Sequence, residues 1–563
     1  MHNVIFKTEG GEDVNIFAVG GETILELAYK KNIPIDAPCA GNGTCGKCRV
    51  KVLEGEDSQR PADSDCNDLR KTGLNSDRED GWRLACEFII TGDTVVYVPD
   101  IASAYIKNIT TEVYCPDPGE SPSRKLTVEP MYGLAVDIGT TTVSALLVEM
   151  ETGHTYAKST TGNSQIRYGA DVINRIIQQQ KPDGVKKLQE AIVQETLVPL
   201  IDNLCASTGI TRDKIIRMTV ASNTTMNHLL LGIDANSIRI EPYEPAFLEF
   251  EPYDPSGIGI DLAPAAKMIL APNIGSYVGG DITAGVLSAA TNFGVKMCER
   301  PEMTLLIDLG TNGEIVYGND EFLMACACSA GPAFEGGDIS SGMRATDGAI
   351  EACSIEKDTM EPKITVIGDV KPAGLCGSGL IDAVAELFRT GIINGKGKIS
   401  REGKRIRRDE YGTGSYVLVF AKDTATNTDI IITEVDIDNF IRAKGAIFSG
   451  IMSLLAPLGF TPADIDDVMI AGGIGSGINV RNAISIGMLP DLPENKYSYI
   501  GNSSLSGAYE MLTVPGAEER LQEIAGNMTY IELSTQPGYM DEFIAACFLP
   551  HTDETLFPSL LSP

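Results

Sequence analysis

The chain has 563 residues, too many for one hydrophobic core, because single cores stop growing at about 250 to 300 residues. A hydrophobic fraction of 43% and a charged fraction of 22% are typical of a folded globular protein and exclude a disordered tail. The 77 acidic residues outnumber the 45 basic ones, and the net charge of −32 argues against nucleic acid as a partner.

The chain shows no sign of membrane insertion or secretion. No apolar run reaches the roughly 18 residues that a membrane span needs, and the first residues lack the basic and then apolar order of a signal peptide. Thirteen cysteines, an odd number scattered along the chain, argue for thiols in a reducing compartment rather than a disulfide scaffold. We therefore expect a cytoplasmic protein with no membrane partner.

The first 96 residues have the pattern of a small α+β domain. The stretches "NVIFK" and "DVNIFAV" alternate as two strands, and "TILELAYKKN" has the apolar spacing of a short helix. The closing strands follow at "KCRVKVLEG" and "GWRLACEFIITGDTVVYVP". This order predicts a β-grasp fold over residues 1–96.

Three cysteines in the loop "PCAGNGTCGKC" point to an iron–sulfur cluster. A [2Fe–2S] cluster takes four thiolates, three of them clustered and the fourth far along the chain. We expect the ligands to be Cys39, Cys45, Cys48 and Cys86. The spacing of the first pair is one residue longer than the plant-type pattern, so the cluster type is better specified than the loop geometry.

Two alternatives to this assignment stay open. Four cysteines also bind structural zinc, but zinc sites usually show two close cysteine pairs, which this region lacks. Cys66 competes with Cys86 as the fourth ligand. The charged setting of Cys66 suits an exposed loop, whereas Cys86 follows an apolar strand, so Cys86 is preferred.

A linker at residues 97–130 leads into a repeated pattern. The stretch "MYGLAVDIGTTTVSALLVE" is a strand, a glycine turn and a second strand, and the pattern returns at "MTLLIDLGTNGEIVYGN". Two copies of one unit predict two related lobes, at 131–300 and 301–549, followed by a tail at 550–563. Each lobe is expected to be an α/β unit of the β-β-β-α-β-α-β-α type.

The repeated D-x-G-T turn suits phosphate binding. A glycine turn brings backbone N–H groups close to a phosphate, threonine hydroxyls add donors, and an aspartate holds hydrated Mg²⁺ against the phosphate charge. One loop would consist of Asp137, Gly139, Thr140 and Thr141. The other would consist of Asp308, Gly310, Thr311, Asn312 and Gly313.

Two later features complete the predicted nucleotide site. The stretch "AGGIGSG" follows a strand, and its residues Gly472, Gly473, Gly475 and Ser476 leave room for a ligand beside the backbone. Asp281 in "GGDITAGV" stands where the lobes would connect, and a helix N-cap is an equally good interpretation of that residue.

Together these motifs resemble a known family. The order of "GLAVDIGTTTVSA", "IDLGTNGEIV", "SAGPAFEGG" and "AGGIGSG" resembles the acetate and sugar kinase, Hsp70 and actin superfamily, with its duplicated ribonuclease H-like, actin-like ATPase fold. With "CAGNGTCGKC" in front, the chain resembles the reductive activators of corrinoid proteins. The resemblance implies a [2Fe–2S] cluster, ATP and Mg²⁺ as cofactors. Its expected activity is ATP-dependent reduction of the Co(II) corrinoid of a partner methyltransferase protein to Co(I).

The resemblance also suggests roles and partners. Asp137 and Asp308 would position Mg²⁺ and the attacking water, with Glu314 or Glu335 as a candidate base, although a buried structural carboxylate is the blander interpretation of either glutamate. Lys444 and its neighbour Arg442 would lie along the adenosine, unless they form a solvated basic face. A low-potential electron donor is required, and the chain would act alone or as a homodimer.

Other functions remain as alternatives. A small-molecule kinase with a regulatory ferredoxin domain, a nucleotide-switched interaction module, and an ATP-driven donor to another low-potential enzyme would share the ATPase pattern. Cys326, Cys328 and His228 are interpreted as packed structural residues, because no further metal ligands stand nearby in the sequence.

Overall fold

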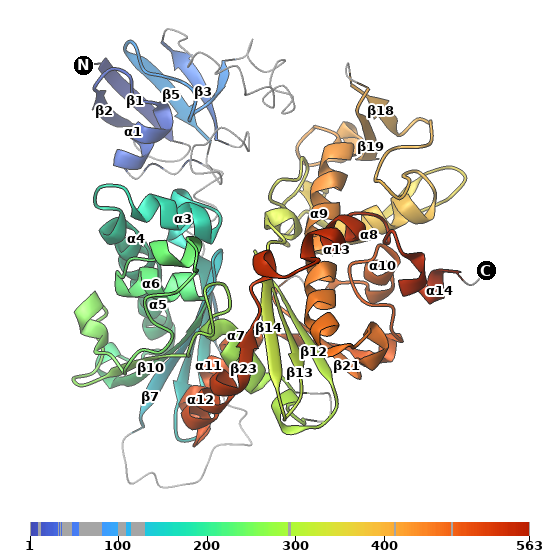
Figure 1. Cartoon of the computed structure of the whole chain (residues 1–563). Coiled ribbons are helices and arrows are strands. Elements are labelled where there is room, and N and C mark those ends of the chain that lie inside the picture. The colour runs from blue at the N-terminus through green and yellow to red at the C-terminus, as the bar shows by residue number, and fades with distance from the viewer. Residues whose placement is uncertain are drawn as a thin grey trace. The chain divides into compact units, whose positions relative to one another are not determined.

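The protein is described by a computed structural model that covers residues 2–8, 13–31, 33, 35, 48–55, 81–99, 109–113, 130–290, 294–409, 412–473 and 477–561. Contacts divide the chain into two compact units (Figure 1). The first comprises Met1–Val220 and Thr225–Leu270, and the second comprises Ala221–Thr224 and Ala271–Pro563. The division after Leu270 lies ahead of the lobe boundary that the sequence pattern predicts at residue 300.

Residues 2–99 contain a five-stranded sheet and one helix. The elements are β1 His2–Thr8, β2 Val14–Ala18, α1 Ile24–Lys30, β3 Arg49–Glu54, β4 Trp82–Leu84 and β5 Thr94–Val98. The strand order is β2-β1-β5-β3-β4, with β1 antiparallel to β2 and parallel to β5. Helix α1 begins after Thr23, which forms a capping box with Glu26. This mixed sheet is the β-grasp arrangement that the sequence predicts.

The first lobe is built on a six-stranded sheet. Its strands are β6 Thr110–Val113, β7 Tyr132–Ile138, β8 Thr142–Glu149, β9 Thr155–Gly162, β10 Ile215–Ser222 and β11 Lys267–Leu270. They lie in the order β11-β10-β7-β8-β9-β6. The edge strand β6 comes from the predicted linker and pairs with β9. Six of the seven residues of the central strand β7 are buried, as expected for a strand that is covered on both faces.

The second lobe repeats the order of five of these strands. Its strands are β12 Thr304–Leu309, β13 Gly313–Gly318, β14 Leu323–Cys328, β21 Asp467–Ala471, β22 Tyr497–Gly501 and β23 Met528–Tyr530. Their order is β22-β21-β12-β13-β14-β23, so in both lobes an antiparallel three-strand meander is extended by two parallel strands beside its first strand. The lobes differ at the edge, where β23 is parallel to β14 while β6 is antiparallel to β9. The repeated strand order confirms the duplicated, actin-like α/β fold.

Helices surround the two sheets. In the first lobe they are α3 Val172–Gln179, α4 Gly184–Ile192, α5 Val198–Thr208 and α6 Thr224–Leu231, and α7 Gly280–Ser288 follows. The second lobe contains α9 Glu434–Leu455, α10 Val480–Ser485, α11 Ser503–Thr513, α12 Ala517–Asn527, α13 Tyr539–Ala546 and α14 Pro558–Leu561. Helix α7 packs on α11, where the Ser288 hydroxyl donates to the Ser503 carbonyl at 2.7 Å.

An insertion between β14 and α9 lies outside the duplicated pattern. It contains β15 Ala349–Ile355, β16 Pro362–Val366, β17 Gly374–Leu375, α8 Gly377–Arg389, β18 Ile406–Arg408, β19 Gly414–Val419 and β20 Ile430–Thr433. These strands form two three-stranded sheets. The sequence pattern predicts the flanking strands and helix but assigns no fold to this segment.

Helix α9 is the long core helix of the second lobe. It lies against β13 and β14 (Figure 1) and is capped by Thr433, which forms a capping box with Asp436. Among the described residues, Glu434–Leu458 is the one helical segment long and apolar enough to cross a membrane. Of its most apolar window, 67% is buried inside the protein, so core packing accounts for its composition.

Candidate functional site

The two D-x-G-T turns lie at equivalent places in the two sheets. In the first lobe the turn joins β7 to β8, and in the second it joins β12 to β13. The N–H of Gly139 donates to the carbonyl of Thr142, whereas the N–H of Gly310 donates to the carbonyl of Asn312, each at 3.0 Å. The second turn is therefore one residue tighter than the first.

Strand register places two carboxylates opposite each other in the second lobe. Asp308 on β12 pairs directly with Glu314 on β13, so both side chains point to the same face of the sheet. The equivalent residue opposite Asp137 in the first lobe is Ser144. Of these two hairpins, only the one in the second lobe has two acids facing each other.

Glu314 has the most perturbed carboxyl group of this site. Burial raises its pKa well above the usual value, and the nearby carboxylates of Asp281 and Asp308 raise it further, against a smaller lowering by a hydrogen bond from Asn312. Glu314 is 8% exposed. In the absence of a cation, Glu314 therefore favours the protonated, neutral form at pH values where an exposed glutamate is charged.

This arrangement fits a hydrated Mg²⁺ rather than a closed metal cage. Among the described residues, no three His, Cys, Asp or Glu side chains converge as a set of direct metal ligands. Mg²⁺ usually keeps several waters and takes one or two carboxylates together with phosphate oxygens. Asp308, Glu314 and Asp281 would supply such contacts, and a dication would offset their mutual repulsion.

Asp281 lies in the first turn of α7, so the interpretation of this residue as the helix N-cap is wrong. The N-cap is Gly279, where an added Cβ would stand 2.4 Å from the backbone nitrogen of Thr224. The hydroxyl of Thr224 donates to the carbonyl of Gly275 at 2.6 Å. A close backbone approach and a buried hydroxyl therefore fix the start of α7, and with it the position of Asp281.

Gly472 approaches the acidic pair from β21. Its φ is +91°, and an added Cβ would lie 2.3 Å from the carbonyl oxygen of Leu309 and 2.7 Å from Oδ1 of Asp308. An added Cβ at Gly473 would meet nothing within 4 Å. Glycine is therefore required at the first position by close packing, while the second position is open. The predicted residues Gly475 and Ser476 lie outside the described residues.

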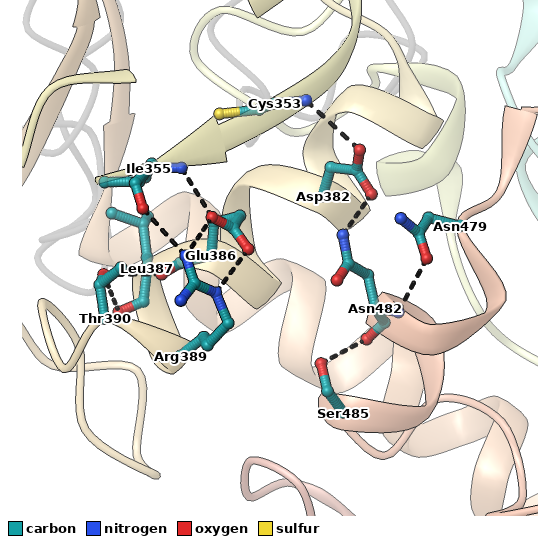
Figure 2. A network of polar contacts seen from close by, with 10 residues as sticks. All are labelled: Cys353, Ile355, Asp382, Glu386, Leu387, Arg389, Thr390, Asn479, Asn482 and Ser485. Atoms are coloured by element: carbon teal, nitrogen blue, oxygen red, sulfur yellow. Dashed lines mark hydrogen bonds and ion pairs between the residues drawn. The ribbon is translucent and has the colours of Figure 1, made fainter. Parts of the chain in front are cut away.

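The helix that follows this glycine loop is held by a partly buried polar network (Figure 2). Asp382 on α8 accepts from Nδ2 of Asn482 on α10 at 2.7 Å and from the N–H of Cys353 on β15 at 3.3 Å. Burial raises the pKa of Asp382, opposed by the hydrogen bond from Asn482. The network ties α10 to α8 and so holds the chain just after the glycine loop.

The remaining residues of the second turn have packing roles that the structure makes plain. The hydroxyl of Thr311 donates to Oε1 of Glu335 at 2.9 Å. An added Cβ at Gly313 would stand 2.7 Å from Sγ of Cys328, so this glycine lets β13 and β14 pack closely. An added Cβ at Gly310 would meet only the carbonyl oxygen of Asn312, at 3.8 Å.

Lys444 is fully buried, and its ammonium group donates to the carbonyls of Phe548 and Pro550. Burial lowers the pKa of Lys444 to about 7. The lysine anchors the segment after α13 to α9. Arg442 forms an exposed ion pair with Asp438. Adenosine contacts by Lys444 and Arg442 stay predictions.

Cys326, Cys328 and His228 are packed in the protein interior, as the sequence favours. The thiol of Cys328 donates to the carbonyl of Gly313 at 3.1 Å, and burial raises the pKa of both cysteines. Nε2 of His228 accepts from the N–H of Ala246 at 3.1 Å.

Two of the four predicted cluster cysteines meet in the β-grasp domain. Sγ of Cys48 and Sγ of Cys86 lie 3.3 Å apart, although the residues are 38 positions apart in sequence. Cys48 immediately precedes β3 and Cys86 lies just after β4, and the N–H of Ala85 donates to the carbonyl of Cys48 at 2.7 Å. Cys39, Cys45 and the alternative ligand Cys66 lie outside the described residues.

Comparison with known proteins agrees with this architecture. Residues 7–91 match the 2Fe-2S iron-sulfur cluster binding domain, 132–292 match the RACo middle region, and 302–561 match the C-terminal domain of RACo, the ASKHA domain. The corrinoid activation enzyme RamQ of Eubacterium limosum is 31% identical, over 92% of this chain and 95% of its own length. The chain belongs to this family of corrinoid activators.

Two further proteins are similar to this chain over most of its length. A solved structure of a reductive activator for a corrinoid, iron-sulfur protein is 36% identical, covers 99% of this chain and 100% of its own, and superposes with a TM-score of 0.69. The [Co(II) methylated amine-specific corrinoid protein] reductase of Methanosarcina barkeri is 25% identical, over 71% of this chain and 73% of its own length.

The contrast between Gly472 and Gly473 yields a matched pair of substitutions. In this corrinoid activator we expect Gly472→Ala to destabilise the second lobe by ~1–3 kcal/mol, because the methyl group collides with Leu309 and Asp308 at a strained φ. Gly473→Ala is expected to change stability by less than ~0.5 kcal/mol. Thermal unfolding of both variants checks this difference, and equal midpoints would contradict the close approach at Gly472.

The raised pKa of Glu314 has a consequence for stability. Above the ordinary glutamate value of 4.5, the unfolded chain loses a proton that the folded chain retains, so stability falls as pH rises, by about 1.4 kcal/mol per pH unit until the folded pKa is reached. Glu314→Gln should remove this contribution. We would compare the unfolding of both proteins without nucleotide from pH 4.5 upward. The exposed-site variant Glu402→Gln should follow the wild type.

Proposed function

We propose that the chain is an ATP-dependent reductive activator that passes an electron from its [2Fe–2S] cluster to the Co(II) corrinoid of a partner methyltransferase protein, regenerating Co(I). The observation that carries this proposal is the full-length likeness to a reductive activator, at 36% identity over 99% of this chain. The small-molecule kinase alternative is not favoured, because the likeness extends through the β-grasp domain as well as both lobes.

The cluster would be held by Cys39, Cys45, Cys48 and Cys86. Among the described residues, Cys48 and Cys86 support this assignment of the cluster ligands. Their sulfur atoms are 3.3 Å apart, although the two residues are 38 positions apart in sequence. Both are buried, so their thiolates would be sheltered from water. When bound, a plant-type [2Fe–2S] cluster supplies a one-electron carrier near about −400 mV.

The nucleotide would be ATP with Mg²⁺. The backbone turns at Gly139–Thr141 and Gly310–Gly313 are suited to phosphate oxygens, and Asp308 with Asp281 to the hydrated metal ion. Glu314 would act as the base for the attacking water only after the bound cation has displaced its own proton. The open position at Gly473 would face the adenosine.

ATP is needed because the electron transfer is uphill. The Co(II)/Co(I) couple is expected to lie below the potential of the cluster, and a shortfall of about 120 mV would leave about one corrinoid in a hundred reduced. A nucleotide-dependent conformation that binds the Co(I) form more tightly shifts this equilibrium. We further propose a cytoplasmic location, a separate low-potential electron donor and a homodimer as the state to test.

The assignment of the fourth ligand can be tested by paired substitution. Cys86→Ser should lose the visible absorption of the cluster, because the sulfur facing Cys48 is removed. Cys66→Ser should keep the spectrum of the wild type. Anaerobic reconstitution of each full-length variant, with iron and sulfide content and electron paramagnetic resonance of the reduced form, measures the result. The reverse pattern would assign Cys66 as the ligand.

The activity itself is tested anaerobically with reduced protein and a Co(II) corrinoid protein. With MgATP, the Co(I) absorption band should rise as the Co(II) band falls, and without nucleotide the change should be small. Asp308→Ala should lower the rate by at least ~10²-fold if it positions the metal ion and water. The exposed control Asp320→Ala should keep the rate. ATP hydrolysis with persistent Co(II) would show that cobalt is the wrong acceptor.

A further inference from the structure

A buried arginine and a buried asparagine lie behind the first phosphate-binding turn. Arg175 on α3 and Asn163, which directly follows β9, are both completely buried. Nη2 of Arg175 donates to the carbonyl of Thr140. Nδ2 of Asn163 donates to the carbonyl of Gly139 at 2.9 Å. The N–H of Asn163 donates to the carbonyl of Thr141 at 2.8 Å, so three consecutive carbonyls of the turn are bound from these two residues.

These contacts determine which way the peptide groups of the turn face. In a planar trans peptide, the carbonyl of one residue and the N–H of the next point in opposite directions. Binding the carbonyls of Gly139 and Thr140 therefore directs the N–H groups of Thr140 and Thr141 away from Asn163 and Arg175. Successive N–H groups that point to one side form a concave site for an anion.

Arg175 is itself held by several neighbours. Nε donates to the carbonyl of Gly169 at 2.9 Å, and Nη1 donates to Oε1 of Gln165 at 3.2 Å and lies 3.3 Å from Sδ of Met226. Nδ2 of Asn163 lies 3.8 Å from the same sulfur. A guanidinium fixed at this many points holds the turn in one conformation and places a positive charge behind it. In a buried setting that charge is weakly screened.

We propose that Arg175 and Asn163 are positioning residues for the phosphate groups of the nucleotide, acting through the Gly139–Thr141 turn rather than by contact with the ligand. This inference rests on the proposed function, since it concerns the same nucleotide site. The D-x-G-T pattern predicts the turn but not these two residues, which come from segments outside the motif.

The test compares the binding of phosphate-bearing and phosphate-free ligands. Full-length wild type, Arg175→Met and Arg175→Lys are titrated calorimetrically with MgATP, MgADP and adenosine. We expect Arg175→Met to weaken ATP and ADP binding by about 10- to 100-fold, because a charge-assisted hydrogen bond to the turn is lost. Adenosine binding should not change. Arg175→Lys keeps the charge and should recover part of the lost affinity.

A matched control separates positioning from general destabilisation. Arg212 also bonds a backbone carbonyl, that of Val198, but far along the chain from the turn, so Arg212→Met should bind all three ligands as the wild type does. Equal loss of ATP and adenosine affinity in Arg175→Met, or no loss of either, would overturn the inference. If Arg175→Met does not fold, the ratio of ATP to adenosine affinity in Arg175→Lys and Asn163→Ala decides the question. A wild type that binds no ATP would instead overturn the proposed function.

Discussion

The facing carboxyl groups of Asp308 and Glu314 are the constraint around which the second lobe is built. Direct cross-strand pairing puts two acids side by side, with Glu314 buried and Asp281 near enough to raise its pKa further. Like charges in this arrangement are unfavourable, so the site needs either a proton on Glu314 or a cation between the acids and the phosphates. In the proposed site a proton and Mg²⁺ would compete for Glu314, and binding of MgATP would release the proton. The tight packing of Gly472 against Asp308 leaves the acids little freedom to separate.

The two lobes share the order of five strands but differ in the side chains at their turns. Where the second lobe has Glu314 opposite its aspartate, the first has Ser144 opposite Asp137. The second hairpin has two facing acids, whereas the first has the single acid Asp137 and the buried guanidinium of Arg175 behind the carbonyls of its turn. The proposed ligand, MgATP, contains both a dication and a polyanion, which carboxylates and N–H groups respectively would bind. The two similar turns therefore differ in the charged side chains that surround them.

Motifs with a fixed spacing made much of this architecture predictable from sequence. The β-grasp domain and the paired strand–turn–strand units follow from apolar periodicity and glycine turns, and the repeated strand order confirms them. Residues joined only by folding were not predictable in the same way. Arg175 and Asn163 are an ordinary arginine and asparagine in the sequence, and only the packing of α3 and of the segment after β9 beside the turn gives them the proposed role. The sequence allows Asp281 to be read as the N-cap of α7, but the N-cap is Gly279, two residues earlier. The close approach of Gly279 to Thr224 sets this position, and no sequence pattern indicates such an approach.

Coupling nucleotide to electron transfer requires that a change at the turns reach a surface that a partner protein contacts. To convert a reduced fraction of about one in a hundred into a large majority, the nucleotide-bound conformation must favour the Co(I) complex by roughly 10⁴-fold. Such a preference for the Co(I) complex needs strands and helices that move together as rigid units. In the second lobe, β12, β21, α8 and α10 are joined in this way. Asp308 lies on β12, which pairs with β21 before Gly472, and α10 beyond the glycine loop is bound to α8 through Asp382 and Asn482 (Figure 2). Because Asp382 is buried and β12 is directly paired with β21, a shift at the proposed phosphate-binding turn would displace the helices together rather than be absorbed locally.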